Sequence, residues 1–169
     1  MPFIYLFLVG LLLGCSSKES TNKEEKWNKE KSIELSRSVA IKEKLAIKMY
    51  LAHRPSLKME ETGTGLNYYI YQKTTLPMAS SGREAGITYT ISFLNGTKCY
   101  SVDSTSIEFH KIDHSELETG LQEGLKKMRL GEKAILIIPS HLAHGLTGDQ
   151  NKIPPLTPLV IDITLKELR

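Results

Sequence analysis

The sequence has few cysteines, no long apolar run and no net charge over most of its length, and each shortage excludes a class of protein. Its two cysteines, Cys15 and Cys99, are too few for a disulfide framework. The apolar run of residues 2–14 is shorter than the roughly 20 residues that a membrane-spanning helix needs. Residues 63–169 contain eleven basic and eleven acidic side chains, which excludes a basic nucleic-acid footprint. The composition leaves one globular domain with an N-terminal extension.

The N-terminus has the features of an export signal. The uncharged apolar run of residues 2–14 has the length of a signal-peptide core. Its end, LLGC, resembles the lipobox of bacterial lipoproteins, in which the cysteine is acylated and becomes the mature N-terminus. The resemblance implies a signal peptide over residues 1–14 and a lipid on Cys15 that holds the protein on a membrane. The basic residue that usually precedes such a core is absent, and a plain secretory signal or an uncleaved anchor are the alternatives.

Two charged segments separate this signal from the domain. Residues 15–31 are almost free of apolar side chains, which predicts a flexible tether. Residues 32–62 predict a helical spacer whose helix ends before Pro55. One broad face of this helix, interrupted by Lys42, carries Leu35, Val39, Ala46, Met49 and Tyr50. Such a face could dock on the domain, pair with another subunit or only space the domain from the membrane, and the spacer is the preferred interpretation.

The domain, residues 63–169, opens with strand patterns. The expected strands cover residues 66–71, 87–94 and 97–101. In the first two, apolar and polar side chains alternate, as they do in strands with one buried face. Asn95-Gly96 after the second strand is the strongest short signal for a hairpin. Residues 74–86 have the proline, serine and glycine content of a loop.

The rest of the domain predicts one helix followed by more strands. Leu121, Leu125 and Met128 fall at i, i+4 and i+7, so residues 120–129 should form a short amphipathic helix. The strands expected after it cover residues 132–138 and 159–165. This order predicts an α+β fold, in which an antiparallel curled sheet is wrapped around one short α-helix.

Four short motifs lie in this domain. They are GLQEGL from Gly120, GEKA from Gly131, IPSHLAHG from Ile138 and IPPLTPLVIDI from Ile153. In order and spacing they resemble the signature of the FKBP-type peptidyl-prolyl cis-trans isomerases, over roughly residues 64–169. With the lipobox and the charged helical segment, the chain resembles in particular the gliding-motility-associated FKBP lipoproteins.

The resemblance implies a catalyst of rotation about X-Pro amides, whose barrier is about 18–20 kcal/mol. Because the rotation breaks no bond to hydrogen, it needs no acid–base catalyst. An apolar pocket that removes water from the amide, together with a few hydrogen-bond donors placed for the twisted amide, is sufficient. The sequence accordingly shows no Ser-His-Asp set or phosphate loop, and no cofactor is expected. No metal is expected either, because the pairs His141 with His144 and His110 with His114 lack a third ligand at characteristic spacing.

The resemblance also assigns nine pocket positions. Those that match the family are Tyr89, Leu117, the backbone N–H of Glu118 as donor to the peptide carbonyl, and Ile153. Those that depart from it are Cys99 and Tyr100 for Phe-Asp, Leu121 for the Trp of the floor, His144 for Tyr, and Ile161 for Phe. A further aromatic is expected within residues 107–112, where Phe109 and its neighbours remain open. The implied pocket is roomier and less aromatic than is usual for the family.

The leading hypothesis is an isomerase that assists the folding of exported or envelope proteins, with their proline-containing segments as partners and no nucleic acid. Its lipid would hold it in the cell envelope facing the periplasm, with the outer membrane as the preferred location. The alternative is a non-catalytic FKBP-fold binding or chaperone module of an envelope complex, such as that of gliding motility. The missing aromatics at Leu121, His144 and Ile161 favour this alternative.

Substitution of the proposed lipidated cysteine tests the membrane anchor. Cys15→Ser should move the protein from the membrane fraction to the soluble fraction, because no acyl chain can then be attached. Cys99→Ser is the control and should leave the protein with the membranes. Fractionation followed by immunodetection measures both, and a Cys15→Ser protein that still sediments with membranes contradicts the anchor.

Overall fold

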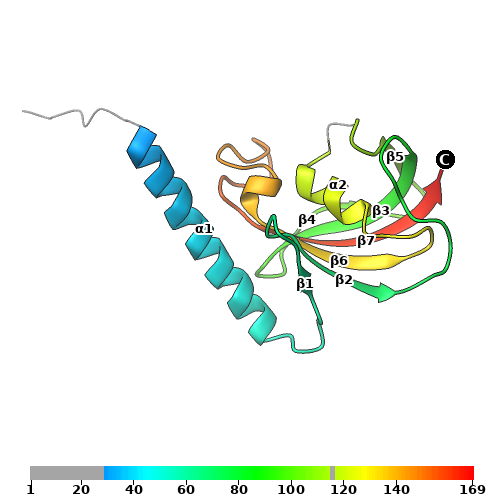
Figure 1. The fold of residues 1–169 in the computed structure, drawn as a ribbon, viewed down its shortest axis with the longest axis horizontal. Coiled ribbons are helices and arrows are strands. Elements are labelled where there is room, and N and C mark those ends of the chain that lie inside the picture. Colours follow the sequence, from blue (N-terminus) through cyan, green and yellow to red (C-terminus); the bar gives the residue numbers. More distant parts are fainter. Residues whose placement is uncertain (1–28, 115–116) are drawn as a thin grey trace, which may run out of the picture.

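A seven-stranded antiparallel sheet curls around one short helix in the computed structural model, which describes residues 29–114 and 117–169 (Figure 1). The strands are β1 (Glu60–Glu61), β2 (Asn67–Gln72), β3 (Glu84–Phe93), β4 (Lys98–Val102), β5 (Glu108–Lys111), β6 (Lys133–Ile138) and β7 (Leu159–Leu168). The helices are α1 (Lys29–Ala52), α2 (Thr119–Leu125) and the short 3-10 helix η1 (Ser140–Leu142). The predicted α+β fold is confirmed. The expected signal peptide and Cys15 lie outside the described residues.

Strand β7 holds the sheet together, because it pairs with β6 on one side and with β3 on the other. The strand order is β1-β2-β6-β7-β3-β4, and β5 pairs with β3 beside this path. Every second side chain of β7 is fully buried, as its alternation predicted: Leu159, Ile161, Ile163 and Leu165. A slip of one residue would turn all four to the opposite face, so burial fixes the register.

Helix α2 packs on the concave face of the sheet (Figure 1). Leu121, Leu125 and Met128 are buried, as their spacing predicted. The helix ends at Leu125, however, and not at residue 129. The N–H groups of Lys127 and Met128 bond to the carbonyls three residues earlier, which tightens the chain into a turn.

At the start of β3 and in β5, pairing with distant strands forms strand structure that the local sequence does not predict. Strand β3 begins at Glu84, inside the expected loop of residues 74–86, because Ala85 and Gly86 pair with both β5 and β7. Strand β5 was not predicted at all, and its sequence EFHK has no apolar alternation. Both strand segments depend on partners that are distant in sequence.

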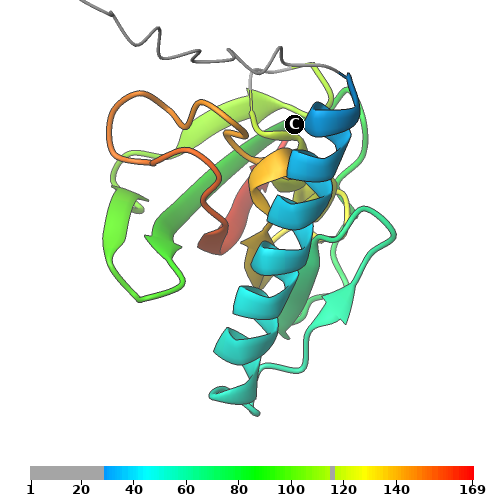
Figure 2. The same ribbon diagram turned by 90° about the vertical axis from the view of Figure 1, so that its left-hand side faces the viewer.

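Helix α1 packs against the domain through a face that overlaps the predicted one (Figure 2). Val39, Ala46 and Tyr50 of the predicted face are half-buried. Glu43 and Ile47 are buried at 7% and 6% exposure, whereas Leu35 and Met49 of the expected face are exposed. The helix begins at Lys29, within the expected tether. It therefore docks on the domain, which was one of the three alternatives. In the part of the chain that the structure describes, no helix is both long and apolar enough to cross a membrane.

The close approach of α2 to the sheet predicts that Gly120 cannot be enlarged. A Cβ at Gly120 would lie 2.4 Å from Cγ2 of Ile138 and 3.1 Å from the backbone oxygen of Leu142. Gly120→Ala should therefore lower the free energy of unfolding by about 1–3 kcal/mol. Gly63→Ala is the control, since a Cβ there meets no atom within 4 Å. Urea denaturation measures both, and equal stability of the two variants would contradict this packing.

Candidate active site

The apolar residues assigned to the pocket come together in one cluster. It contains Tyr89, Cys99, Tyr100, Leu117, Leu121, Ile153 and Ile161. Leu121 and Ile153 are 2% exposed and Ile161 is 1% exposed, so all three belong to the buried core of the domain, and they are called the apolar floor below. Tyr89, Tyr100 and Leu117 are half-buried and provide the part of the cluster that a ligand would meet first.

The hydroxyl of Tyr89 binds a carboxylate. It donates to Oε2 of Glu108 on β5 at 2.9 Å, and Nε2 of His110 lies 3.3 Å from the same oxygen. Burial, followed by the hydrogen bond to Glu108, raises the pKa of Tyr89 far above its usual value. The hydroxyl therefore stays protonated and remains a donor at neutral pH.

The further aromatic expected within residues 107–112 is not part of this site. The residue of this segment that reaches Tyr89 is the acidic Glu108. Phe109 is exposed, and the guanidinium of Arg169 lies 4.2 Å from the centre of its ring. Sequence reasoning missed Glu108, because no local pattern indicates β5, and only its pairing with β3 in the structure brings Glu108 near Tyr89.

The remaining two assigned residues form an ion pair. Nε2 of His144 lies 3.0 Å from Oε1 of Glu118, and both side chains are largely buried. Glu118 precedes the first turn of α2, where backbone N–H groups lack partners within the helix. Glu118 also acts electrostatically on Tyr89 and adds to the rise of its pKa. This arrangement gives the His144 ring a protein partner.

A hydrogen bond from Tyr100 holds the long loop before β7 against the sheet. Its hydroxyl on β4 donates to Oδ2 of Asp149. The other oxygen of Asp149 accepts the N–H of Asn151 at 2.9 Å and that of Ile153 at 2.7 Å. The loop is thus folded around the carboxylate, and Ile153 is placed in the apolar floor.

Lys152 adds a second attachment between this loop and β4. Its Nζ donates to the backbone oxygen of Cys99 at 3.1 Å and lies 4.8 Å from the centre of the Tyr100 ring. Both attachments reach the dipeptide Cys99-Tyr100, at which the chain departs from the family pattern. Tyr100 therefore acts on the site through the loop.

The stability that this loop contributes depends on pH through the ionisation of Asp149. Loss of hydration acts to raise the pKa of Asp149, but hydrogen bonds to its carboxylate outweigh this and lower the pKa to about 2. The donors are Tyr100 and the N–H groups of Asn151 and Ile153, and His144 acts in the same direction. Since the folded pKa is depressed, ionised Asp149 stabilises the fold above about pH 4, and this contribution is lost as the pH falls towards about 2.

Cys99 has the character of a packing residue. Its side chain is buried, and Sγ donates to the backbone oxygen of Ile91 at 3.3 Å. Burial raises the pKa of the thiol, which keeps it protonated and unreactive at neutral pH. Among the residues that the structure describes, no three His, Cys, Asp or Glu side chains gather to hold a metal ion.

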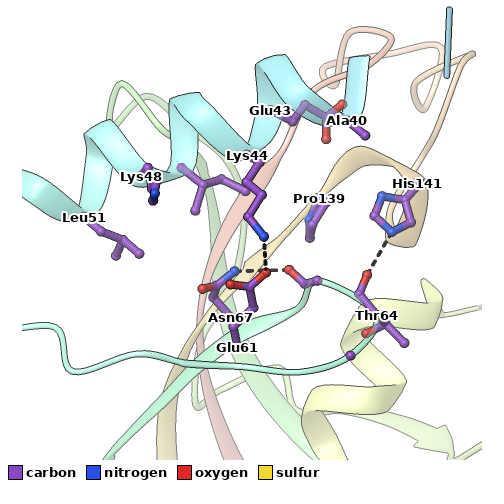
Figure 3. Close-up of a pocket in the computed structure, with 13 residues that line it drawn as sticks. Ala40, Glu43, Lys44, Lys48, Leu51, Glu61, Thr64, Asn67, Pro139 and His141 are labelled. Carbon is purple, nitrogen blue, oxygen red and sulfur yellow. Dashed lines mark hydrogen bonds and ion pairs between the residues drawn. The ribbon is translucent and has the colours of Figure 1, made fainter. Parts of the chain in front are cut away.

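A hollow of about 320 Å³ lies elsewhere, between α1 and the domain (Figure 3). Its lining includes Glu43, Lys44, Ile47, Leu51, Pro139 and His141. None of the nine assigned residues lines this hollow. It is a product of the way in which α1 docks, and it is separate from the apolar cluster.

Residues 77–166 match the family model of the FKBP-type peptidyl-prolyl cis-trans isomerases. The chain belongs to this family. FK506-binding protein 2 of Dictyostelium discoideum is 41% identical over 87 residues, which are 50% of this chain and 65% of that protein. FK506-binding protein 4 of the same organism is 30% identical over 112 residues, 66% of this chain and 30% of that protein. The chain thus spans less than two thirds of either relative.

Solved structures show the same FKBP fold. FkpA from Escherichia coli superposes with a TM-score of 0.67 at 22% identity, covering 82% of this chain and 64% of that one. A peptidyl-prolyl cis-trans isomerase from Pseudomonas syringae pv. tomato has a TM-score of 0.60 at 25% identity, with coverage of 74% and 94%. These similarities support the fold of the FKBP domain and of its sheet.

Removal of the Tyr100 hydroxyl should loosen the loop. In Tyr100→Phe, the amides of Asn151 and Ile153 should exchange with solvent about tenfold faster, because one hydrogen bond to a charged carboxylate is lost. Tyr71→Phe is the matched control, since the Tyr71 hydroxyl also donates to a carboxylate, that of Asp162 at 2.8 Å. Hydrogen exchange measured by NMR checks both variants. Equal protection of the two amides in both would show that Tyr100 does not hold the loop.

Proposed function

We propose that the chain is a peptidyl-prolyl cis-trans isomerase that assists the folding of exported or envelope proteins. The observation that supports this most is the gathering of the assigned residues within the FKBP domain. Leu121, Ile153 and Ile161 would supply the apolar surface, Tyr89 packs on the same core and donates to Glu108, and His144 lies beside Glu118 at the start of α2. These are the components that rotation of an amide requires, an apolar surface and a few fixed polar groups.

The proposed mechanism is differential binding of the twisted amide. In the planar amide, resonance gives the C–N bond double-bond character, and rotation by 90° removes it at a cost of about 18–20 kcal/mol. A proline ring on the Leu121 floor would lose its hydration together with the adjoining carbonyl. Only contacts that strengthen in the twisted state lower this barrier, so the backbone N–H of Glu118 would have to fit the rotated carbonyl.

Polar side chains would fix the geometry of this site without exchanging protons with the substrate. The protonated Tyr89 hydroxyl is held by Glu108, and the His144 ring is held by Glu118. Both groups are therefore oriented before a ligand arrives, which reduces the entropy lost on binding. Aliphatic Leu121 and Ile161 offer less contact area than aromatic rings, so weak binding of any single proline segment is expected.

The cellular role is proposed from the N-terminal sequence. The LLGC motif at Cys15 supports a lipid anchor, and α1 begins at Lys29, only a short polar segment later. This would keep the FKBP domain near the membrane surface within the cell envelope, the outer membrane being preferred. Proline-containing segments of proteins that cross or enter the envelope would then be its substrates.

One observation favours a second candidate, a non-catalytic binding or chaperone module. The floor residues Leu121, Ile153 and Ile161 are almost wholly covered, and the aromatic residues that the family has at positions 121, 144 and 161 are absent. Such a module would hold an unfolded segment or a partner of an envelope complex, such as the gliding-motility machinery that the finer resemblance suggests.

Exchange NMR on a proline peptide separates the two candidates. The isomerase predicts that the full chain, in detergent, increases cis-trans exchange, which is otherwise a process of tens to hundreds of seconds. It also predicts that the double variant Leu121→Trp with His144→Tyr changes the rate by less than about tenfold. The module predicts no acceleration by the native chain and new activity in the double variant. Unchanged exchange at high concentration of the native chain would refute the isomerase.

A further inference from the structure

A buried carboxylate on α1 has no role in the site described above. Glu43 is 7% exposed and accepts two hydrogen bonds from Ser140, one from its backbone N–H at 2.8 Å and one from its hydroxyl. Figure 3 shows Glu43 on α1 beside the segment that carries Pro139 and His141. Burial of an acid is costly unless its oxygens are hydrogen-bonded. The two hydrogen bonds from Ser140 offset this cost and allow Glu43 to be buried here.

Ser140 in turn organises the segment that follows it. Its backbone oxygen accepts the N–H of Ala143 at 3.0 Å and that of Gly145 at 2.8 Å. The residue between these two donors is His144, whose ring lies 3.0 Å from Glu118. The oxygen of Gly145 also accepts the N–H of Leu156, which ties the turn to the long loop before β7. A continuous set of contacts therefore joins α1 to the polar border of the pocket.

We propose that Glu43 is a positioning residue for the pocket, because it fixes Ser140 and through it the turn that presents His144 to Glu118. The proposal deepens the proposed isomerase function and rests on it for the effect on activity. On this proposal, α1 contributes to the geometry of the site, and it can also act as a spacer between the domain and the membrane. It does not require that α1 contact the substrate.

The rest of the α1 contact is too sparse to fix the turn. Ile47 is the other buried side chain of α1, and the ion pair of Lys44 with Glu61 is exposed to solvent, at 3.1 Å. Exposed ion pairs contribute little, and a hollow separates parts of the helix from the domain. Precise placement of the helix against the turn therefore depends on Glu43 and Ser140.

Three variants of the full chain test this role. Glu43→Ala removes both acceptors of Ser140. Glu43→Gln is the rescue, since its amide oxygen can accept the Ser140 N–H while its amide nitrogen donates to the Ser140 hydroxyl. Glu61→Gln is the matched control, because Glu61 is also an acid at the α1 contact and pairs with Lys44, not with the turn.

The readouts are the NMR signals of the His144 ring, followed against pH, and kcat and KM for a proline peptide. Glu43→Ala should shift the His144 signals and its titration, and lower kcat/KM about fivefold, mainly through kcat. Glu43→Gln and Glu61→Gln should remain close to the native chain in both readouts. A folded Glu43→Ala protein with native His144 signals would overturn the proposal.

Two further outcomes remain decisive. If Glu43→Ala does not fold, Ser140→Ala takes its place, since it deletes only the hydroxyl and should shift the His144 signals in the same direction. Native His144 signals in Ser140→Ala would then overturn the proposal. If the native chain has no isomerase activity, the proposed function fails, whereas the His144 signals still decide whether Glu43 controls the turn.

Discussion

The pairing of β7 with both β3 and β6 is the constraint on which the rest of the structure depends. Its register sets Ile161 between Ile91 and Leu136, and it sets Tyr89 opposite Ile163. Ile161 of the floor and Tyr89 thus lie on neighbouring central strands of one sheet. Because Leu159, Ile161, Ile163 and Leu165 are all buried on one face of β7, a shift of one residue in its register would expose them.

Around this floor, polar contacts join separate segments of the chain. Three of them are Tyr89 with Glu108, His144 with Glu118, and Tyr100 with Asp149. Each joins segments that are distant in sequence, and each gives a partner to a partly buried polar group. Helix α1 joins the same arrangement through the hydrogen bonds of Glu43 with Ser140.

The sequence predicted those features that depend on local alternation or on a short motif. The buried face of β7, the α2 spacing of Leu121 and Leu125, and membership of the FKBP family all follow from such patterns. Glu108 and Glu43 could not be predicted, because their partners lie 19 and 97 residues away and an acid is ordinarily expected at the surface. The end of α2 and the start of β3 were misplaced for the same reason: strand pairing and turn hydrogen bonds decided them, and local propensity did not.

The central claim is that proline segments bind over the floor formed by Leu121, Ile153 and Ile161, and not in the hollow beneath α1. The most direct test is a titration of the isotope-labelled full chain with a proline peptide, followed through backbone amide and methyl shifts. The account predicts the largest changes at the Glu118 amide and at the methyl groups of Leu121 and Ile153. Changes confined to Ile47, Leu51 and their neighbours, with the Glu118 amide unmoved, would contradict it.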